Sequence, residues 1–214
     1  TVERATIPVQ HWTQPSGAQV YLVESPAIAM VDVQIDFDAG SRRDPPGQAG
    51  LASMTANMLE KGVREKDGAP ALDENALGEA WADLGADFGA GASADRMSFS
   101  LRSLTDPVLL DQAVALAARQ IAEPAYPDAV WQRERQRLDA ALKESYTRPA
   151  SVVGRAYAKA VYGNHPYGYE MTEATLASIS VADLQAAHAA GVVACRARIG
   201  LVGAVTRAQA DAIA

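Results

Sequence analysis

The alternation of hydrophobic and polar side chains along the chain predicts a β-sheet. Between residues 31 and 38, valine, isoleucine and phenylalanine alternate with aspartate and glutamine. A period of two places one kind of side chain on each face of a strand, which is typical of an antiparallel sheet with one buried and one solvated face. Three more segments are interpreted as strands: residues 18–24, 96–102 and 197–203. The last is apolar enough to lie in the centre of the sheet.

Other segments carry the signals of helices. Residues 48–61 follow Pro-Pro-Gly and end at Gly62, a residue suited to a helix C-cap. Asp106-Pro107 places proline at the first position of a helix that runs to about residue 122. Further helices are expected over residues 74–84, 127–146, 151–162 and 181–190, with a loop at 63–70. Helices grouped between mostly antiparallel strands predict an α+β fold of two layers, with one sheet covered by helices.

Composition and charge exclude several classes of function. The net charge is −7 and there is no block of Lys and Arg, which argues against nucleic-acid binding. The most basic stretch, residues 133–137, is interpreted as a solvated helix face. No run of about 18 apolar residues exists, so no membrane span is expected. The single cysteine, Cys195, excludes an internal disulfide and is interpreted as a small buried strand residue.

The usual catalytic constellations are also missing from the sequence. The three imidazoles do not cluster with other ligand types at metal-like spacing; they are His11, His165 and His188. Ser53 has no histidine and aspartate spaced to form a catalytic triad. No phosphate loop or dinucleotide fingerprint supports an enzyme with another cofactor.

One segment does carry a recognisable frame. Residues 39–62 read Ala-Gly-Ser-Arg-Arg-Asp-Pro-Pro-Gly-Gln-Ala-Gly-Leu-Ala-Ser-Met-Thr-Ala-Asn-Met-Leu-Glu-Lys-Gly. This segment resembles the pitrilysin/insulysin family of zinc peptidases, which includes mitochondrial-processing-peptidase-like subunits. In that family the inverted zinc motif His-x-x-Glu-His lies between Gly-Leu-Ala and Met-Leu-x-Lys-Gly. Here the two histidine positions hold Ser53 and Asn57, and the glutamate position holds Ala56.

These replacements remove the groups that zinc hydrolysis needs. Catalytic zinc is held by imidazole nitrogens and a carboxylate, and a nearby base activates the metal-bound water. Ser53 and Asn57 keep the i, i+4 spacing but offer weak neutral oxygens. Ala56 has no proton acceptor. We therefore expect no metal and no catalytic residue in this chain.

The family's last zinc ligand is a glutamate on a later helix. Residues 131–142 resemble the family's Phe-x-Arg-Glu-Arg-x-Val-Val-Leu-x-Glu-Ile stretch, and this alignment places the ligand position at Ala141. A shifted register would bring Asp139 or Glu144 near that position. One acid without two imidazoles still makes a poor zinc site.

Four more segments resemble the family in the same order along the chain: residues 16–23, 77–85, 165–168 and 201–203. The resemblance implies that residues 1–214 form a single N-terminal domain. It also implies a second, related C-terminal domain beyond the chain end, carrying the Arg/Tyr substrate-binding pair of zinc-less subunits.

The glycine-rich segment within residues 86–93 is interpreted as a strand. In catalytic members of the family the corresponding strand is an edge on which the substrate peptide is laid. This edge has no bulky side chains over the residues Gly89, Ala90, Gly91 and Ala92. They form a wall for a peptide, or else they reflect packing or lost constraint after the site decayed.

The resemblance implies a non-catalytic subunit of a heterodimeric zinc metallopeptidase. Such a subunit would shape a peptide chamber and support a His-x-x-Glu-His partner that holds the zinc. The alternative is a purely structural or assembly protein, like the zinc-less core subunits of respiratory complexes. We expect a bacterial protein of the periplasm or cytoplasm, with the periplasm preferred. The sequence does not identify the substrate.

Overall fold

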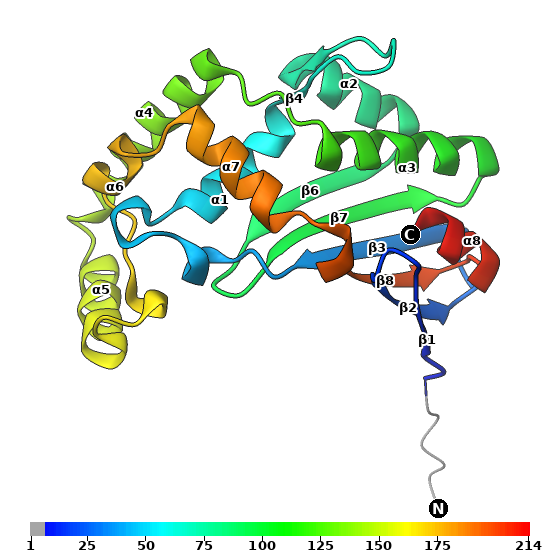
Figure 1. The fold of residues 1–214 in the computed structure, drawn as a ribbon, viewed down its shortest axis with the longest axis horizontal. Helices are drawn as coiled ribbons and strands as arrows, with labels where there is room; N and C mark the ends of the chain where they lie inside the picture. Colours follow the sequence, from blue (N-terminus) through cyan, green and yellow to red (C-terminus); the bar gives the residue numbers. More distant parts are fainter. Residues whose placement is uncertain (1–6) are drawn as a thin grey trace, which may run out of the picture.

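A six-stranded sheet forms the centre of the structure, a computed structural model that describes residues 7–214. The strand order is β1-β2-β8-β3-β7-β6 (Figure 1). The strands are β1 Gln10–Thr13, β2 Gln19–Glu24, β3 Met30–Phe37, β6 Asp87–Ala92, β7 Met97–Leu104 and β8 Arg198–Gly203. Neighbours are antiparallel except β2 and β8, which run parallel. The predicted mostly antiparallel sheet is confirmed, with β8 in its interior.

Helices cover one face of this sheet. The helices of residues 7–214 are α1 Leu51–Met58, α2 Glu74–Leu84, α3 Pro107–Ala122, α4 Asp128–Ser145, α5 Pro149–Tyr162, α6 Glu173–Ala177, α7 Val181–Gly191 and α8 Arg207–Ile213. Figure 1 shows α1 and α3 along β6 and β7, α7 beside α1, and α5 projecting from the body. The two-layer α+β prediction is therefore confirmed.

The alternation in the sequence determines which face is covered. On β3 and β7, Val31, Val33, Phe99 and Leu101 are buried beneath the helices. Their neighbours on the same strands point to the opposite face, which is wet and polar. A strand turns successive side chains to opposite faces, so one hydrophobic and one polar set follow from the pattern alone.

Helix α1 is shorter than the predicted helix over residues 48–61. Short 3-10 turns flank it, η2 Pro46–Gln48 before it and η3 Leu59–Lys61 after it. Gly62, which follows η3, has φ +133°. The predicted start of α3 is confirmed, because the Asp106 side chain accepts hydrogen bonds from the N–H groups of Val108 and Leu109.

Other predictions need correction. The segment predicted as a loop after Gly62 contains the strand β4 Gly62–Val63, which pairs with β5 Leu72–Asp73. Strand β1 and the short helices α6 and α8 were not predicted, because each is too short to show a clear period. The prediction that Cys195 is a buried strand residue is wrong. Cys195 is exposed in the 3-10 turn η5 Ala194–Arg196, just before β8.

The helices of residues 7–214 include none with both the length and the apolar character needed to cross a membrane.

Candidate functional site

A buried carboxylate holds the start of α1, the helix that carries the three motif positions. Asp44 accepts hydrogen bonds from the main-chain N–H groups of Gly50 (3.0 Å) and Ala52 (3.0 Å). Burial raises the pKa of Asp44, although these N–H groups act in the opposite direction. Gly50 has φ +105°, and a Cβ on it would lie 2.7 Å from Met171 Cε. Glycine therefore suits the entry to α1.

The three motif positions lie in two different environments. Ser53 and Asn57 are half-buried and lie one turn apart on the same face of α1. Ala56 has 0% of its surface exposed and belongs to the hydrophobic core. The face therefore keeps the geometry of a two-histidine motif, with a hydroxyl and an amide in place of imidazoles. At the third position, the side chains of the core surround the methyl group of Ala56.

The fourth position, Ala141, is exposed on α4 and offers a methyl group. Of the two acids near it, Glu144 forms an ion pair with Arg148, and Asp139 Oδ1 has no hydrogen-bond partner. From residue 7 to the end of the chain, no group of three or more His, Cys, Asp or Glu side chains could hold a metal ion. The chemistry of these side chains does not fit a zinc centre.

An ion-pair cluster joins η3, the turn that follows α1, to α2 and α4. Lys61 Nζ lies 2.6 Å from Glu74 Oε1 and 4.0 Å from Glu134 Oε1. Glu134 also pairs with Arg137 at 2.8 Å, and Glu74 with Arg133 at 2.6 Å. The prediction that residues 133–137 form a solvated face is wrong for Glu134, which is buried between these cations.

The cluster is electrostatically satisfied. Burial alone would raise the pKa of Glu134, but the Arg137 hydrogen bond and the charges of Lys61 and Arg137 hold it below its usual value. Hydrogen bonds from Lys61 and Arg133 lower the pKa of Glu74. Two ionised carboxylates with cationic partners are poor general bases at neutral pH. We assign them a structural role in fixing α1 relative to α4.

Strand β6 is an edge of the sheet, as expected for the glycine-rich segment. It pairs with β7 on one side only, with Gly89 opposite Ser100 and Gly91 opposite Ser98. The N–H groups of an antiparallel strand point alternately to its two edges. Ser93 N–H bonds to Arg96 O across the hairpin, so the groups at alternate positions before it also point toward β7. The main-chain groups of Phe88, Ala90 and Ala92 point to the free edge.

The two glycines of β6 differ in how tightly they are packed. A Cβ on Gly89 would lie 3.0 Å from Ser100 Oγ, whereas a Cβ on Gly91 would meet nothing within 4 Å. Packing therefore favours glycine at position 89 and leaves position 91 free. Loss of constraint after the zinc site decayed is enough to explain glycine at position 91. It does not explain glycine at position 89, where a Cβ would crowd Ser100.

One side chain missed in the sequence lies at this edge. The carboxylate of Glu60 accepts a hydrogen bond of 2.9 Å from the main-chain N–H of Ala90. Glu60 follows Asn57 by three residues, so both project from the same side of the α1–η3 segment. That i, i+3 spacing was the available signal. The row Ser53, Asn57 and Glu60 thus leads from the motif positions to the free edge of β6.

The three histidines lie on separate elements and have local roles. His165 Nδ1 accepts the N–H of Tyr167 at the 3-10 turn η4 Pro166–Gly168, in agreement with a structural turn. His188 on α7 is hydrogen-bonded to the carbonyl of Ile121 at 2.7 Å, and burial lowers its pKa. His11 Nε2 lies 2.8 Å from Gln19 Oε1.

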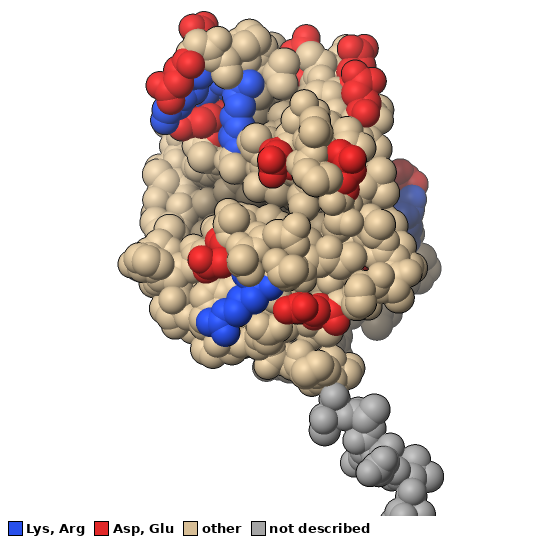
Figure 2. Space-filling view, turned by 90° about the vertical axis from the view of Figure 1, so that its right-hand side faces the viewer, with Lys and Arg blue, Asp and Glu red and all other residues tan. Residues whose placement is uncertain are grey.

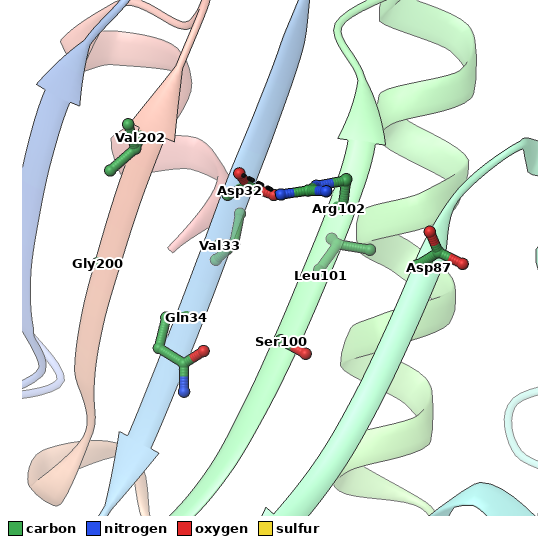
Figure 3. A pocket seen from close by; sticks show the side chains of 9 residues that line it. All are labelled: Asp32, Val33, Gln34, Asp87, Ser100, Leu101, Arg102, Gly200 and Val202. Carbon is green, nitrogen blue, oxygen red and sulfur yellow. Dashed lines mark hydrogen bonds and ion pairs between the residues drawn. The ribbon is translucent and has the colours of Figure 1, made fainter.

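A shallow cavity of about 440 Å³ lies on the face of the sheet opposite the helices (Figure 3). Gln34, Ser100 and Gly200 are among the residues that line it, and at the same cavity Arg102 Nε donates to Asp32 Oδ1 at 2.6 Å. The hydrogen bond from Arg102 lowers the pKa of Asp32, so this carboxylate is held in an ion pair. A second view shows scattered acidic and basic side chains on the face toward the reader (Figure 2).

The comparison with family models gives one match. The model described as Insulinase (Peptidase family M16) matches residues 19–175. The match includes all four motif positions and β6.

The chain is similar to two solved structures and to one further protein by sequence. A crystal structure of a peptidase M16 inactive domain from Pseudomonas fluorescens is 33% identical, with a TM-score of 0.90 over 96% of this chain and 49% of that chain. The crystal structure of pitrilysin is 22% identical, with a TM-score of 0.75 over 99% of this chain and 22% of that one. The uncharacterized zinc protease YmxG of Bacillus subtilis (strain 168) is 22% identical over 80% of this chain and 41% of its own length. The chain thus spans half or less of these proteins.

Proposed function

The chain belongs to the insulinase family of peptidases, M16, and we propose that it acts as the non-catalytic subunit of a heterodimeric zinc metallopeptidase. The observation that carries this proposal is the set of side chains at the motif positions of α1. Ser53 and Asn57 occupy a metal-motif face without metal ligands, and buried Ala56 replaces the base. The resemblance to an M16 domain called inactive supports the non-catalytic assignment.

In this proposal the partner subunit supplies the chemistry. It carries an intact His-x-x-Glu-His motif and the zinc, which supplies a nucleophilic hydroxide when bound. The present chain shapes the wall of the peptide chamber and limits the size of the substrate. The second, related domain and its Arg/Tyr pair are part of the same proposal, as is a periplasmic location in a bacterium.

The free edge of β6 is the part of this chain that we propose contacts a peptide. An extended peptide adds to such an edge through main-chain hydrogen bonds, and the small residues from Gly89 to Ala92 leave room for its side chains. Helix α1, which carries the motif positions, packs beside β6. Binding of a peptide to this edge uses main-chain groups and does not need the lost zinc ligands.

A second candidate is a purely structural or assembly role. The Glu60 hydrogen bond to Ala90 favours it, because this contact occupies the middle of the edge that a peptide would use. Native proteins often protect edge strands with charged side chains.

Reconstitution separates the two candidates. The full chain is purified alone and together with the product of a neighbouring gene that carries the intact motif. We expect the chain alone to hold no stoichiometric zinc and to cleave no peptide, and the mixture to cleave peptides in a chelator-sensitive way. Partner activity that is unchanged by removal of this chain would favour the structural role. Chelator-sensitive activity of the chain alone would refute the proposal.

A further inference from the structure

Among the described residues, Glu60 makes the one side-chain hydrogen bond to the main chain of β6, which it accepts from the N–H of Ala90. Glu60 is half-buried on η3, directly after α1, and η3 packs beside β6. Its carboxylate takes the position that the carbonyl oxygen of an added peptide strand would take opposite Ala90. The peptide and Glu60 therefore compete for one donor.

The neighbouring donors remain open. The N–H groups of Phe88 and Ala92 point the same way as that of Ala90, and within residues 7–214 they donate to no other group. A permanent cover that pairs with the edge would occupy all three positions, as an added strand does. Glu60 occupies only the central one. The contact has the form of a latch that a strand can displace.

The charge of Glu60 adds a second property. The next residue, Lys61, is held by Glu74 at 2.6 Å, and the Glu60 carboxylate forms no ion pair with any described residue. Once displaced from Ala90, this carboxylate stays next to the incoming chain. A lysine or arginine of the peptide would stabilise it, and an acidic side chain would repel it.

We propose that Glu60 is a latch on the β6 edge, which a peptide main chain must displace and whose charge selects basic over acidic segments. This inference rests on the proposed peptide-binding role of the edge. It makes Glu60 a specificity-determining residue, three positions after the last degenerate motif residue. It also reconciles a closed edge in the free chain with an edge that still receives peptides.

The test uses the full chain with three variants and three fluorescent peptides. The variants are Glu60→Ala, which removes the acceptor, Glu60→Gln, which keeps an acceptor without charge, and Glu79→Ala, a matched loss of an exposed acid on α2. The peptides are extended octamers that are neutral or carry one central lysine or one central glutamate. Amide hydrogen exchange at Ala90 reports the latch without any peptide, and fluorescence anisotropy reports binding.

We expect Glu60→Ala to expose the Ala90 amide to exchange and to bind the neutral octamer about tenfold more tightly, the size of one charge-assisted hydrogen bond. Glu60→Gln should keep Ala90 protected but lose a preference of about two- to fivefold for the lysine peptide over the glutamate peptide. Glu79→Ala should match the unmodified chain in both measurements.

Two results would overturn the latch. One is an unchanged or weaker affinity of Glu60→Ala for the neutral octamer, and the other is the absence of octamer binding by every variant. Neither result touches the dependence of partner activity on this chain, which the reconstitution measures separately. If partner activity needs this chain while Glu60→Ala binds like the unmodified chain, the latch fails and the subunit role stands.

Discussion

The carboxylate of Asp44 lies 3.0 Å from the main-chain nitrogen of Gly50, six residues later. This bond and its companion to Ala52 satisfy two of the first N–H groups of α1, which have no partner within the helix itself. The position of the degenerate motif therefore depends on a loop acid that is not part of the motif.

Removal of this acid should loosen α1. We expect Asp44→Ala to lower the free energy of unfolding by about 2 kcal/mol, because two buried donors lose their acceptor. Asp44→Asn keeps one acceptor oxygen and should cost less. Urea unfolding followed by circular dichroism measures both variants. A loss below about 0.5 kcal/mol for Asp44→Ala, which is the size of ordinary surface changes, would mean that α1 is held by packing alone.

The cluster around Glu134 should contribute a moderate amount of stability. We expect Glu134→Ala to cost about 1–2 kcal/mol, because its cations lose a buried partner while Lys61 keeps Glu74. Glu134→Gln should cost less, since the amide still accepts a hydrogen bond. Chemical unfolding at neutral pH gives both values, with Glu79→Ala as the exposed control. Equal stability of Glu134→Ala and Glu79→Ala would contradict a buried role for Glu134.

Acid should destabilise the chain through the same cluster. Glu74 and Glu134 have pKa values below the ordinary value for glutamate in the folded state. Groups of this kind stabilise the fold above the unfolded-state pKa and lose that contribution as pH falls through the folded-state pKa. Asp44, with a raised pKa, works in the opposite direction. We expect net stability to fall below about pH 4.5, and to fall less steeply in Glu134→Gln. The check is urea unfolding at a series of pH values.

Restoring the zinc-motif residues should destabilise the fold most at one of the three positions. Ala56 is fully buried, so Ala56→Glu places a carboxylate in the core and should cost about 3 kcal/mol or more. Ser53→His and Asn57→His fall on a half-exposed face and should each cost less than about 1 kcal/mol. Thermal unfolding of the three single variants ranks them. An Ala56→Glu variant as stable as the unmodified chain would show that the core still has room for the base.

Much of the fold follows from local patterns. The alternation in residues 31–38 predicts β3 and its buried face, because a strand cannot bury a side chain without exposing the next one. Asp106 and Pro107 predict the start of α3 for an equally local reason. The motif frame in residues 39–62 places Ser53, Ala56 and Asn57 on one helix. These predictions need only neighbours within a few residues.

Elements too short to show a hydrophobic period were not predicted. Strand β1 has four residues and α6 has five, which is too few for a hydrophobic period to emerge. Cys195 was misplaced for a related reason: the apolar stretch around it continues into β8, but a 3-10 turn interrupts it. The burial of Glu134 was missed because its charged neighbours are typical of a surface helix.

The order of residues along the chain was sufficient to determine the two-layer α+β class, the family and the side chains at the three motif positions Ser53, Ala56 and Asn57, since each depends on which side chains occupy a known local frame. Only the tertiary structure decided that Glu60 contacts Ala90 and that Glu134 is buried beside Lys61. The physical reason is distance along the chain. The Glu60–Ala90 bond joins residues 30 apart, and packing of helices on the sheet, rather than any local pattern, brings them together.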